Sequence, residues 1–286
     1  MQPLAWVVGA GGLVGRHVAR RLEQAGHEVR VTSVPWHDEA SSVLALVDAV
    51  DVFTAARAGR AWSVVWCAGA GVVATGEDAL AAEVRVFEAL MAALAGSVGQ
   101  AEDGVVFLAS SAGGLYAGSD RPPFDERTEP APLVPYGRAK LAMEEQVRQV
   151  AADTGLRAVI GRLANVYGPG QTLGKPQGLL SQLCLADATG RPLPVYVSMD
   201  TIRDYVYVED AAAMIVHSLA LVRDEPTASV VVKVLASGRP VTVGYLVSEA
   251  RRVFHRPLRT IPVGGSGVGQ VLDLRLTSRV WPQVDA

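Results

Sequence analysis

The sequence has little of what a disulfide-stabilised, metal-binding or nucleic-acid-binding protein needs. Its two cysteines, Cys67 and Cys184, are too few for a disulfide framework and fit no zinc-site spacing. Each is expected to be a small core residue in a reduced compartment. The 26 basic residues, of which only three are lysines, are balanced by 29 acidic ones. A net charge of −3 leaves no basic patch for nucleic acid.

Long apolar runs are missing as well. No uninterrupted segment approaches the roughly 20 apolar residues that span a bilayer. A glycine-rich turn at Gly9 interrupts the first apolar stretch, and no charged region precedes that stretch, so no signal peptide is expected. These absences predict a cytoplasmic protein with no membrane partner. Hydrophobic residues make up 50% of the chain, enough for one large domain with a smaller appendage.

The first half of the chain alternates short apolar runs with helical patterns. Such alternation predicts buried strands in a parallel sheet that helices cover on both faces. The predicted strands are Leu4–Val8, Glu28–Thr32, Ser63–Cys67, Val105–Ala109 and Arg157–Arg162, and the predicted helices are Leu13–Gln24, Asp78–Leu94 and Gly137–Ala152. We therefore expect an α/β fold with a doubly wound Rossmann sheet.

The pattern loosens after the last of these strands. Glycine and proline gather from Gly168 to Gly178, and the tail from Val241 mixes one helical pattern with short strands. We expect a dinucleotide-binding domain over residues 1–164. Residues 165–286 are expected to form a smaller, irregular substrate-binding lobe, partly interleaved with the first domain.

Gly9, Gly12 and Gly15 stand between the first predicted strand and the first predicted helix. This spacing suits a tight turn whose backbone approaches a pyrophosphate, with the anion on the free N–H groups that begin the helix. NAD sites usually end the second strand with an acidic residue for the ribose 2′-hydroxyl. Here Ser33 stands near that position and the first carboxylate is Asp38. The cofactor is therefore NAD or NADP, with a slight preference for NADP.

Tyr136 and Lys140 lie one helical turn apart at the start of a predicted helix. A tyrosine normally ionises near pH 10, so a phenolate at neutral pH needs about 4 kcal/mol of preferential stabilisation. A neighbouring ammonium and a cationic nicotinamide supply it. The phenolate can then take a proton from a hydroxyl group as hydride leaves the same carbon.

Together these segments resemble the extended short-chain dehydrogenases/reductases of the NAD-dependent epimerase/dehydratase family. The segments that carry the resemblance are Gly9–Gly15, Phe107–Ser111, Tyr136–Lys140, Arg162–Gln171 and Arg203–Asp210. The resemblance implies that Tyr136 is the catalytic acid/base and that Lys140 orients it and binds the nicotinamide ribose. It also implies that Asn165 and Arg203 contact the diphosphate of a nucleotide-sugar substrate. Alternatively, Arg203 forms an ion pair with Asp204 or Asp210, and Asn165 is a turn residue.

The chain departs from the family pattern in three informative places. Ala112 stands where the family has a catalytic Ser or Thr, so we expect Ser111 to take that role, with Ser110 as the alternative. Glu83 replaces a common asparagine. The acidic pair that dehydratases carry after the Ser or Thr is missing, because Ala112 and Gly113 follow Ser111.

These features predict redox chemistry on a nucleotide-diphosphate sugar, with a 4-epimerase as the first candidate and an NADPH-dependent 4-ketosugar reductase as the second. A reductase of small carbonyl compounds and a non-catalytic NAD(P) sensor or scaffold stay open. The helices Asp78–Leu94 and Gly137–Ala152 carry apolar residues on more than one face. Relatives often pair these two helices across a two-fold axis, so a homodimer is expected.

Overall fold

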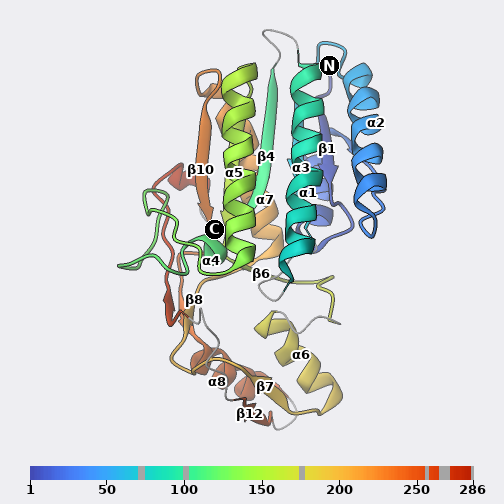
Figure 1. Ribbon diagram of the computed structural model, residues 1–286. Helices are drawn as coiled ribbons and strands as arrows, with labels where there is room; N and C mark the ends of the chain where they lie inside the picture. The colour runs from blue at the N-terminus through green and yellow to red at the C-terminus, as the bar shows by residue number, and fades with distance from the viewer. Residues whose placement is uncertain (70–74, 99–102, 174–177, 255–257, 264–270, 285–286) are drawn as a thin grey trace.

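A six-stranded parallel sheet with strand order β10-β5-β4-β3-β1-β2 forms the centre of the computed structural model (Figure 1). The strands are β1 (Leu4–Val8), β2 (Glu28–Val31), β3 (Trp62–Trp66), β4 (Gly104–Ser111), β5 (Arg157–Leu163) and β10 (Val230–Leu235). The structure describes residues 1–69, 75–98, 103–173, 178–254, 258–263 and 271–284. The chain runs from β1 outward to β2 and then returns to β3 on the other side of β1. This reversal makes the sheet doubly wound, as expected.

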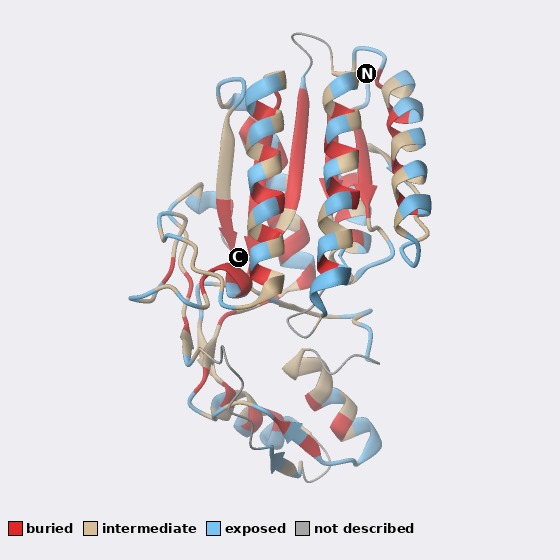
Figure 2. Cartoon of the chain, viewed as in Figure 1, coloured by how far each residue is buried: buried red, intermediate tan, exposed pale blue. Residues whose placement is uncertain are grey.

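Helices cover both faces of the sheet. One face carries α2 (Glu39–Arg57), α3 (Glu77–Ser97) and α5 (Pro135–Thr154), which pack side by side, and the other carries α1 (Leu13–Gln24) and α7 (Val208–Leu221). Because both faces are covered, the central strands are buried along most of their length (Figure 2). At the edge, β2 is half-buried or exposed. None of the helices in the described part of the chain combines the length and apolar character needed to cross a bilayer.

Large aromatic side chains fill the core under α2 and α3. Trp6, Trp62 and Trp66 each project from a strand into this layer and are at most 1% exposed. The rings of Phe53 and Phe87 pack against them at centroid distances of 4.9–5.8 Å. The opposite layer, under α1 and α7, contains smaller aliphatic side chains. These two layers hold the strands rigidly, so residues at their carboxyl ends have fixed positions.

Local signals set the ends of the helices that carry the site. Pro135 begins α5, where its missing N–H costs no hydrogen bond, and Gly155 ends the helix with φ +77°. Asp38 begins α2 by accepting a hydrogen bond from the Ser41 amide. The glycine-rich turn leads directly into α1 at Leu13.

A smaller lobe lies at the carboxyl ends of the strands, below the sheet in Figure 1. It contains α6 (Leu179–Thr189), β7 (Leu193–Val195), β8 (Ile202–Arg203), β11 (Val241–Thr242), α8 (Val243–Val253), β12 (Thr260–Pro262) and β13 (Asp273–Leu274). Between lobe and sheet lie α4 (Ala112–Leu115), β6 (Asn165–Tyr167) and β9 (Tyr205–Tyr207), and the 3-10 turns are η1 (Val222–Asp224) and η2 (Pro282–Val284). The lobe has its own small core around Leu183, Val195 and Val247.

The chain passes between sheet and lobe more than once. After the first lobe segment it returns as α7 and β10, which extends the large sheet beside β5, and it then re-enters the lobe at β11. The fold is therefore the expected α/β sheet with a smaller C-terminal lobe. Part of the glycine- and proline-rich loop expected before Gly178 falls outside the described residues.

Candidate active site

The turn after β1 has three glycines with three different tasks. At Gly9, where φ is +87°, a Cβ atom would lie 2.5 Å from the Ala68 amide nitrogen. At Gly15 a Cβ would lie 2.2 Å from the Gly9 carbonyl oxygen, so this glycine lets α1 pack against the turn. At Gly12 a Cβ would approach only the Gly9 carbonyl oxygen, at 3.3 Å, and no side chain caps the helix there. The open Gly12 position and the uncapped amides fit the pyrophosphate of a dinucleotide.

The Arg16 side chain hydrogen-bonds to the backbone of this turn. Its Nη2 donates a hydrogen bond to the Gly11 carbonyl oxygen at 2.6 Å, and its Nε donates to the Gly12 carbonyl oxygen at 3.1 Å. Arg16 therefore satisfies the carbonyl groups of the turn, while no side chain of the described residues caps the amides at the start of α1.

Tyr136, Lys140 and Ser111 meet in a cleft of about 480 Å³ at the carboxyl ends of the strands, and Gly12 also lines this cleft. The Lys140 Nζ lies 5.8 Å from the centroid of the Tyr136 ring. A Cβ at Gly114 would lie 3.1 Å from the Tyr136 ring and 3.3 Å from the Ser111 Oγ, so this glycine lets the two side chains flank one point. The Ser111 Oγ accepts a hydrogen bond from the Gly114 amide at 3.1 Å.

Ser110, the alternative hydroxyl, is engaged elsewhere. It is 4% exposed, and its Oγ donates to the Glu144 Oε1 at 2.7 Å. That carboxylate also binds the buried guanidinium of Arg162, with the Nη2–Oε2 distance at 2.7 Å. Of the two serines, Ser111 is therefore the one whose hydroxyl hydrogen has no acceptor among the described residues.

Glu83 is the partner of Lys140 that the sequence did not reveal. Its Oε1 lies 3.1 Å from the Lys140 Nζ, and the two side chains are 12% and 6% exposed. The loop at Gly69 runs against both groups, since a Cβ there would lie 3.0 Å from that carboxylate oxygen. The only signal in the sequence was that Glu83 replaced a common family asparagine. The ion pair depends on how α3 packs against α5, and this packing leaves no pattern in the sequence.

Cys67 lies beside this ion pair at the end of β3 and lines the same cleft. Burial raises the pKa of the Cys67 thiol to about 12, although the nearby Lys140 ammonium acts in the opposite direction. The thiol is therefore protonated at neutral pH and is not a nucleophile.

Ser33 and Asp38 lie apart from the cleft that holds Tyr136. Ser33 is exposed just beyond the end of β2. Hydrogen bonds from Ser41 lower the pKa of the Asp38 carboxyl group, which accepts a hydrogen bond from the Ser41 amide in the first turn of α2. Neither residue lines the described cleft, and their expected contact with the cofactor stays a prediction.

Arg203 and Asn165 line a second cleft, of about 250 Å³, which shares Asn165, Val166 and Gly178 with the first. Burial lowers the pKa of the Arg203 guanidinium below its ordinary value. Its Nη1 donates to the carbonyl oxygen of Ile202 at 2.8 Å, and no carboxylate of the described residues lies within ion-pair distance. The Asp273 carboxylate acts on Arg203 from beyond this distance but is itself paired with Arg275. A half-buried cation that no described carboxylate contacts directly suits a phosphate group. Asn165 donates from its amide to the Asp204 carbonyl oxygen at 2.9 Å.

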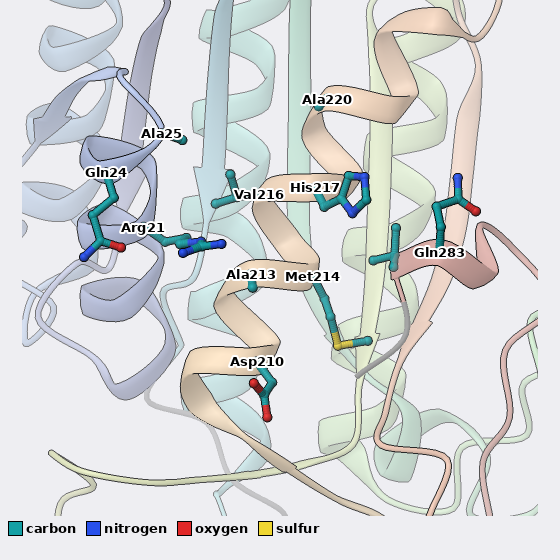
Figure 3. A pocket seen from close by; sticks show the side chains of 11 residues that line it. Arg21, Gln24, Ala25, Asp210, Ala213, Met214, Val216, His217, Ala220 and Gln283 are labelled. Atoms are coloured by element: carbon teal, nitrogen blue, oxygen red, sulfur yellow. The ribbon is translucent and has the colours of Figure 1, made fainter.

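Asp204 and Asp210, the two acidic residues considered as ion-pair partners of Arg203, do not pair with it. The Asp204 carboxylate accepts hydrogen bonds from the amide and hydroxyl of Ser237, at 2.8 and 3.1 Å. Asp210 lines a groove of about 550 Å³ between α1 and α7, with Arg21 and His217 (Figure 3). This groove covers the outer face of the helices and is separate from the cleft at the strand ends. The described residues contain no group of three side chains that could hold a metal ion.

The profile of the NAD dependent epimerase/dehydratase family matches residues 5–232, more than half of the chain. The chain belongs to this family. Members of the family are NAD-dependent enzymes, and the expected resemblance is confirmed. The fold expected from it is confirmed as well.

Curated relatives of this family member carry out three different reactions. A dTDP-4-dehydro-6-deoxyglucose reductase from Escherichia coli is 30% identical over 114 residues, which are 40% of this chain and 36% of that protein. A dTDP-glucose 4,6-dehydratase from Salmonella typhimurium is 37% identical over 91 residues, 32% and 24% of the two chains. A dTDP-L-rhamnose 4-epimerase from Burkholderia thailandensis is 38% identical over 96 residues, 33% and 26%. The matched segments span about a quarter to a third of these relatives.

Solved structures match over nearly the whole chain. MoeE5, in a complex with UDP-glucose and NAD, is 25% identical with a TM-score of 0.76, over 99% of this chain and 90% of that one. The UDP-glucose 4-epimerase of Thermotoga maritima, 23% identical with a TM-score of 0.72 over 96% and 90% of the chains, shows the same fold. NAD is the cofactor of the family and of the MoeE5 complex.

Proposed function

We propose that this chain exchanges hydride between NAD(P) and carbon 4 of a nucleotide-diphosphate sugar, and that it acts as a 4-epimerase. One observation carries the proposal. The cleft with Tyr136, Lys140 and Ser111 adjoins the cleft with Arg203, because Asn165, Val166 and Gly178 line both. A substrate with a reactive hydroxyl at one end and a diphosphate at the other fits two such adjoining clefts.

Each residue has a definite task in this chemistry. The phenolate of Tyr136 takes the proton of the sugar hydroxyl and later returns a proton to the same oxygen. Lys140 stabilises the phenolate, and the Ser111 hydroxyl donates a hydrogen bond to the reacting oxygen. Arg203 binds the diphosphate and so fixes the sugar relative to Tyr136. A nicotinamide bound near Gly12 and Lys140 would supply the hydride acceptor and donor, and epimerisation requires that the hydride return to the opposite face of carbon 4.

A 4,6-dehydratase is disfavoured because β4 leads into Ala112 and Gly113, which supply no acid to eliminate water. A 4-ketosugar reductase is the second candidate. The observation that favours it is the end of β2, where Ser33 carries no charge and the Asp38 carboxylate caps α2. Without a protein carboxylate beside the cofactor ribose, the 2′-phosphate of NADPH meets no repulsion, and the site can accept NADPH.

Tyr136→Phe tests the reaction. This variant loses only the phenolic hydroxyl, so binding of cofactor and nucleotide sugar should persist while turnover falls by about 10²–10⁴-fold. Lys140→Ala should lower both turnover and cofactor affinity, because one ammonium serves both. The measurement is single-turnover hydride transfer, followed by nicotinamide absorbance, with a panel of UDP-, dTDP- and GDP-sugars. Unchanged transfer in Tyr136→Phe would refute the mechanism.

The nucleotide released when the purified protein is denatured distinguishes the two candidates. A mass spectrum that contains tightly bound NAD supports an epimerase, which keeps its cofactor through the cycle. An empty site that takes up NADPH supports a reductase. If the parent protein binds a dinucleotide and converts no sugar of the panel, a sensor or scaffold replaces both candidates.

A further inference from the structure

The site contains a largely buried carboxylate that the proposed chemistry does not use. Glu83 reaches from α3 to Lys140 on α5, and its Oε1 lies 3.1 Å from the Nζ. The other titratable groups close to Lys140 do not balance its charge. Glu144, one turn further along α5, is paired with Arg162 on β5, and the Cys67 thiol at the end of β3 is protonated. Glu83 is therefore the anion that balances Lys140 among the described residues.

This balance matters because Lys140 has two possible effects on Tyr136. An unpaired ammonium close to a phenol stabilises the phenolate and promotes loss of the proton. A carboxylate in contact with the ammonium reduces that effect, since the phenol then experiences a nearly neutral pair. Solvent screens the pair little, because the two side chains are only 12% and 6% exposed. An uncharged asparagine at position 83 would have no comparable effect.

We propose that Glu83 is a positioning residue that holds Lys140 in place and partly cancels its charge, so that Lys140 stabilises a Tyr136 phenolate less than an unpaired ammonium would. The proposal rests on the role of Tyr136 given above. A protonated Tyr136 donates a proton to a ketone, so the reducing step stays available at neutral and mildly alkaline pH. The oxidising step, which needs the phenolate, gains from a rise in pH.

The direct test measures the ionisation of Tyr136 without cofactor or substrate. The tyrosinate absorbance of each variant is followed against pH, and the same titration of its Tyr136→Phe counterpart is subtracted. In Glu83→Gln the carboxylate charge is removed at nearly constant shape, and Tyr136 should titrate about one pH unit lower. Glu83→Asp keeps the charge and should remain close to the parent.

Glu39→Gln is the matched control. Glu39 forms an ion pair of 2.7 Å with Arg85, two residues beyond Glu83 on α3, but both side chains are exposed and face solvent. Removing that carboxylate should leave the Tyr136 titration unchanged. As a second readout, the pH profile of hydride transfer should move to lower pH in Glu83→Gln and stay in place in Glu39→Gln.

An unchanged Tyr136 titration in folded Glu83→Gln would overturn the proposal. If that variant does not fold, Glu83→Asn gives the same comparison with the residue common in the family. Failure of the proposed function looks different. In that case Tyr136→Phe would transfer hydride as the parent does, whatever the titration of Glu83→Gln shows.

Discussion

The three glycines of the turn after β1 can be separated by what surrounds each Cβ position. Gly9 and Gly15 face the protein at distances that no side chain tolerates, 2.5 and 2.2 Å from backbone atoms. Gly12 faces the cleft. The spacing of the three residues in the sequence predicted the motif, and only the surrounding structure distinguishes a glycine needed for folding from one needed for a ligand.

Gly12→Val should fold and lose dinucleotide binding, because its side chain would occupy the place of the pyrophosphate. Gly15→Ala is the contrasting variant and should lower the melting temperature, since its Cβ would collide with the Gly9 carbonyl oxygen. Binding is measured by NADH fluorescence titration and folding by circular dichroism. If Gly12→Val binds dinucleotide with the parent's affinity, the glycine motif is not the cofactor site.

The two serines at the end of β4 give a second residue-scale prediction. Ser111→Ala should lower turnover by about 10²–10³-fold, because a hydrogen bond to the reacting oxygen is lost in the transition state. Ser110→Ala should instead lower the free energy of unfolding by about 1–3 kcal/mol, since the buried Glu144 carboxylate loses a donor. Steady-state kinetics and urea denaturation are compared on both variants. Loss of turnover in Ser110→Ala alone would reverse the assignment.

Contacts between side chains of one helix were more predictable from the sequence than contacts between side chains of different elements. Tyr136 and Lys140 are four residues apart on one helix, so their proximity follows from helical geometry. The Glu83–Lys140 pair joins residues 57 positions apart. Nothing in the sequence specifies how α3 and α5 are rotated against each other, and this rotation decides which side chains meet. The contact between Ser110 on β4 and Glu144 on α5 was hidden in a similar way, because it depends on how α5 packs on the sheet.

At the scale of elements, the apolar runs predicted the central strands closely because these strands are buried on both faces. β1 and α1 have the predicted bounds, Leu4–Val8 and Leu13–Gln24. The short strands of the lobe could not be predicted. β8 has two residues and exists because it pairs with β11 and β13, which are far away in the sequence. Such strands depend on tertiary contacts rather than on local propensity.

A buried ion pair ties α5 to β5 behind the site. Glu144 and Arg162 have side-chain exposures of 1% and 4%, and Arg162 also donates to the Tyr116 hydroxyl at 2.8 Å. Burial raises the pKa of Tyr116 to about 12, so its hydroxyl keeps its proton and donates to the Asp125 carbonyl oxygen at 2.8 Å. This network fixes the helix that carries Tyr136 and Lys140 to the sheet.

Glu144→Gln should lower the free energy of unfolding by about 3–5 kcal/mol, because it leaves the Arg162 charge buried without its anion. Glu145→Gln, at the next and exposed position of the same helix, is the control and should change stability by less than about 0.5 kcal/mol. Urea denaturation measures both. Coincident curves for the two variants would show that the buried pair does not hold α5 in place.

At the scale of the whole molecule, the chain returns from the lobe to the large sheet as α7 and β10. Lobe and sheet are therefore not two consecutive domains joined by a single linker. The lobe lies at the carboxyl ends of the strands, where the chain enters and leaves it (Figure 1). The sequence indicated a loosened second half. The sequence did not show that the chain returns to the large sheet at β10, because the apolar run of β10 resembles that of any other strand.

The predicted homodimer also concerns the whole molecule. α3 and α5 lie side by side on the outer face of the sheet (Figure 1), and small residues such as Ala81 and Ala142 are exposed along them. Small side chains let a second pair of helices approach closely, and a four-helix contact of about 800 Å² per partner is typical of a stable dimer. We therefore expect a homodimer with a two-fold axis across these helices.

Ala142→Arg tests this contact by placing a bulky charge at the predicted interface, where its desolvation would oppose association. This variant should be monomeric by light scattering at micromolar concentration and should keep its fold. Ala55→Arg is the control, because Ala55 is an exposed alanine on α2, away from the predicted contact, and this variant should stay dimeric. A parent protein that is itself monomeric at that concentration would rule out the assembly. A dimer that resists Ala142→Arg and dissociates with Ala55→Arg would move the interface to α2.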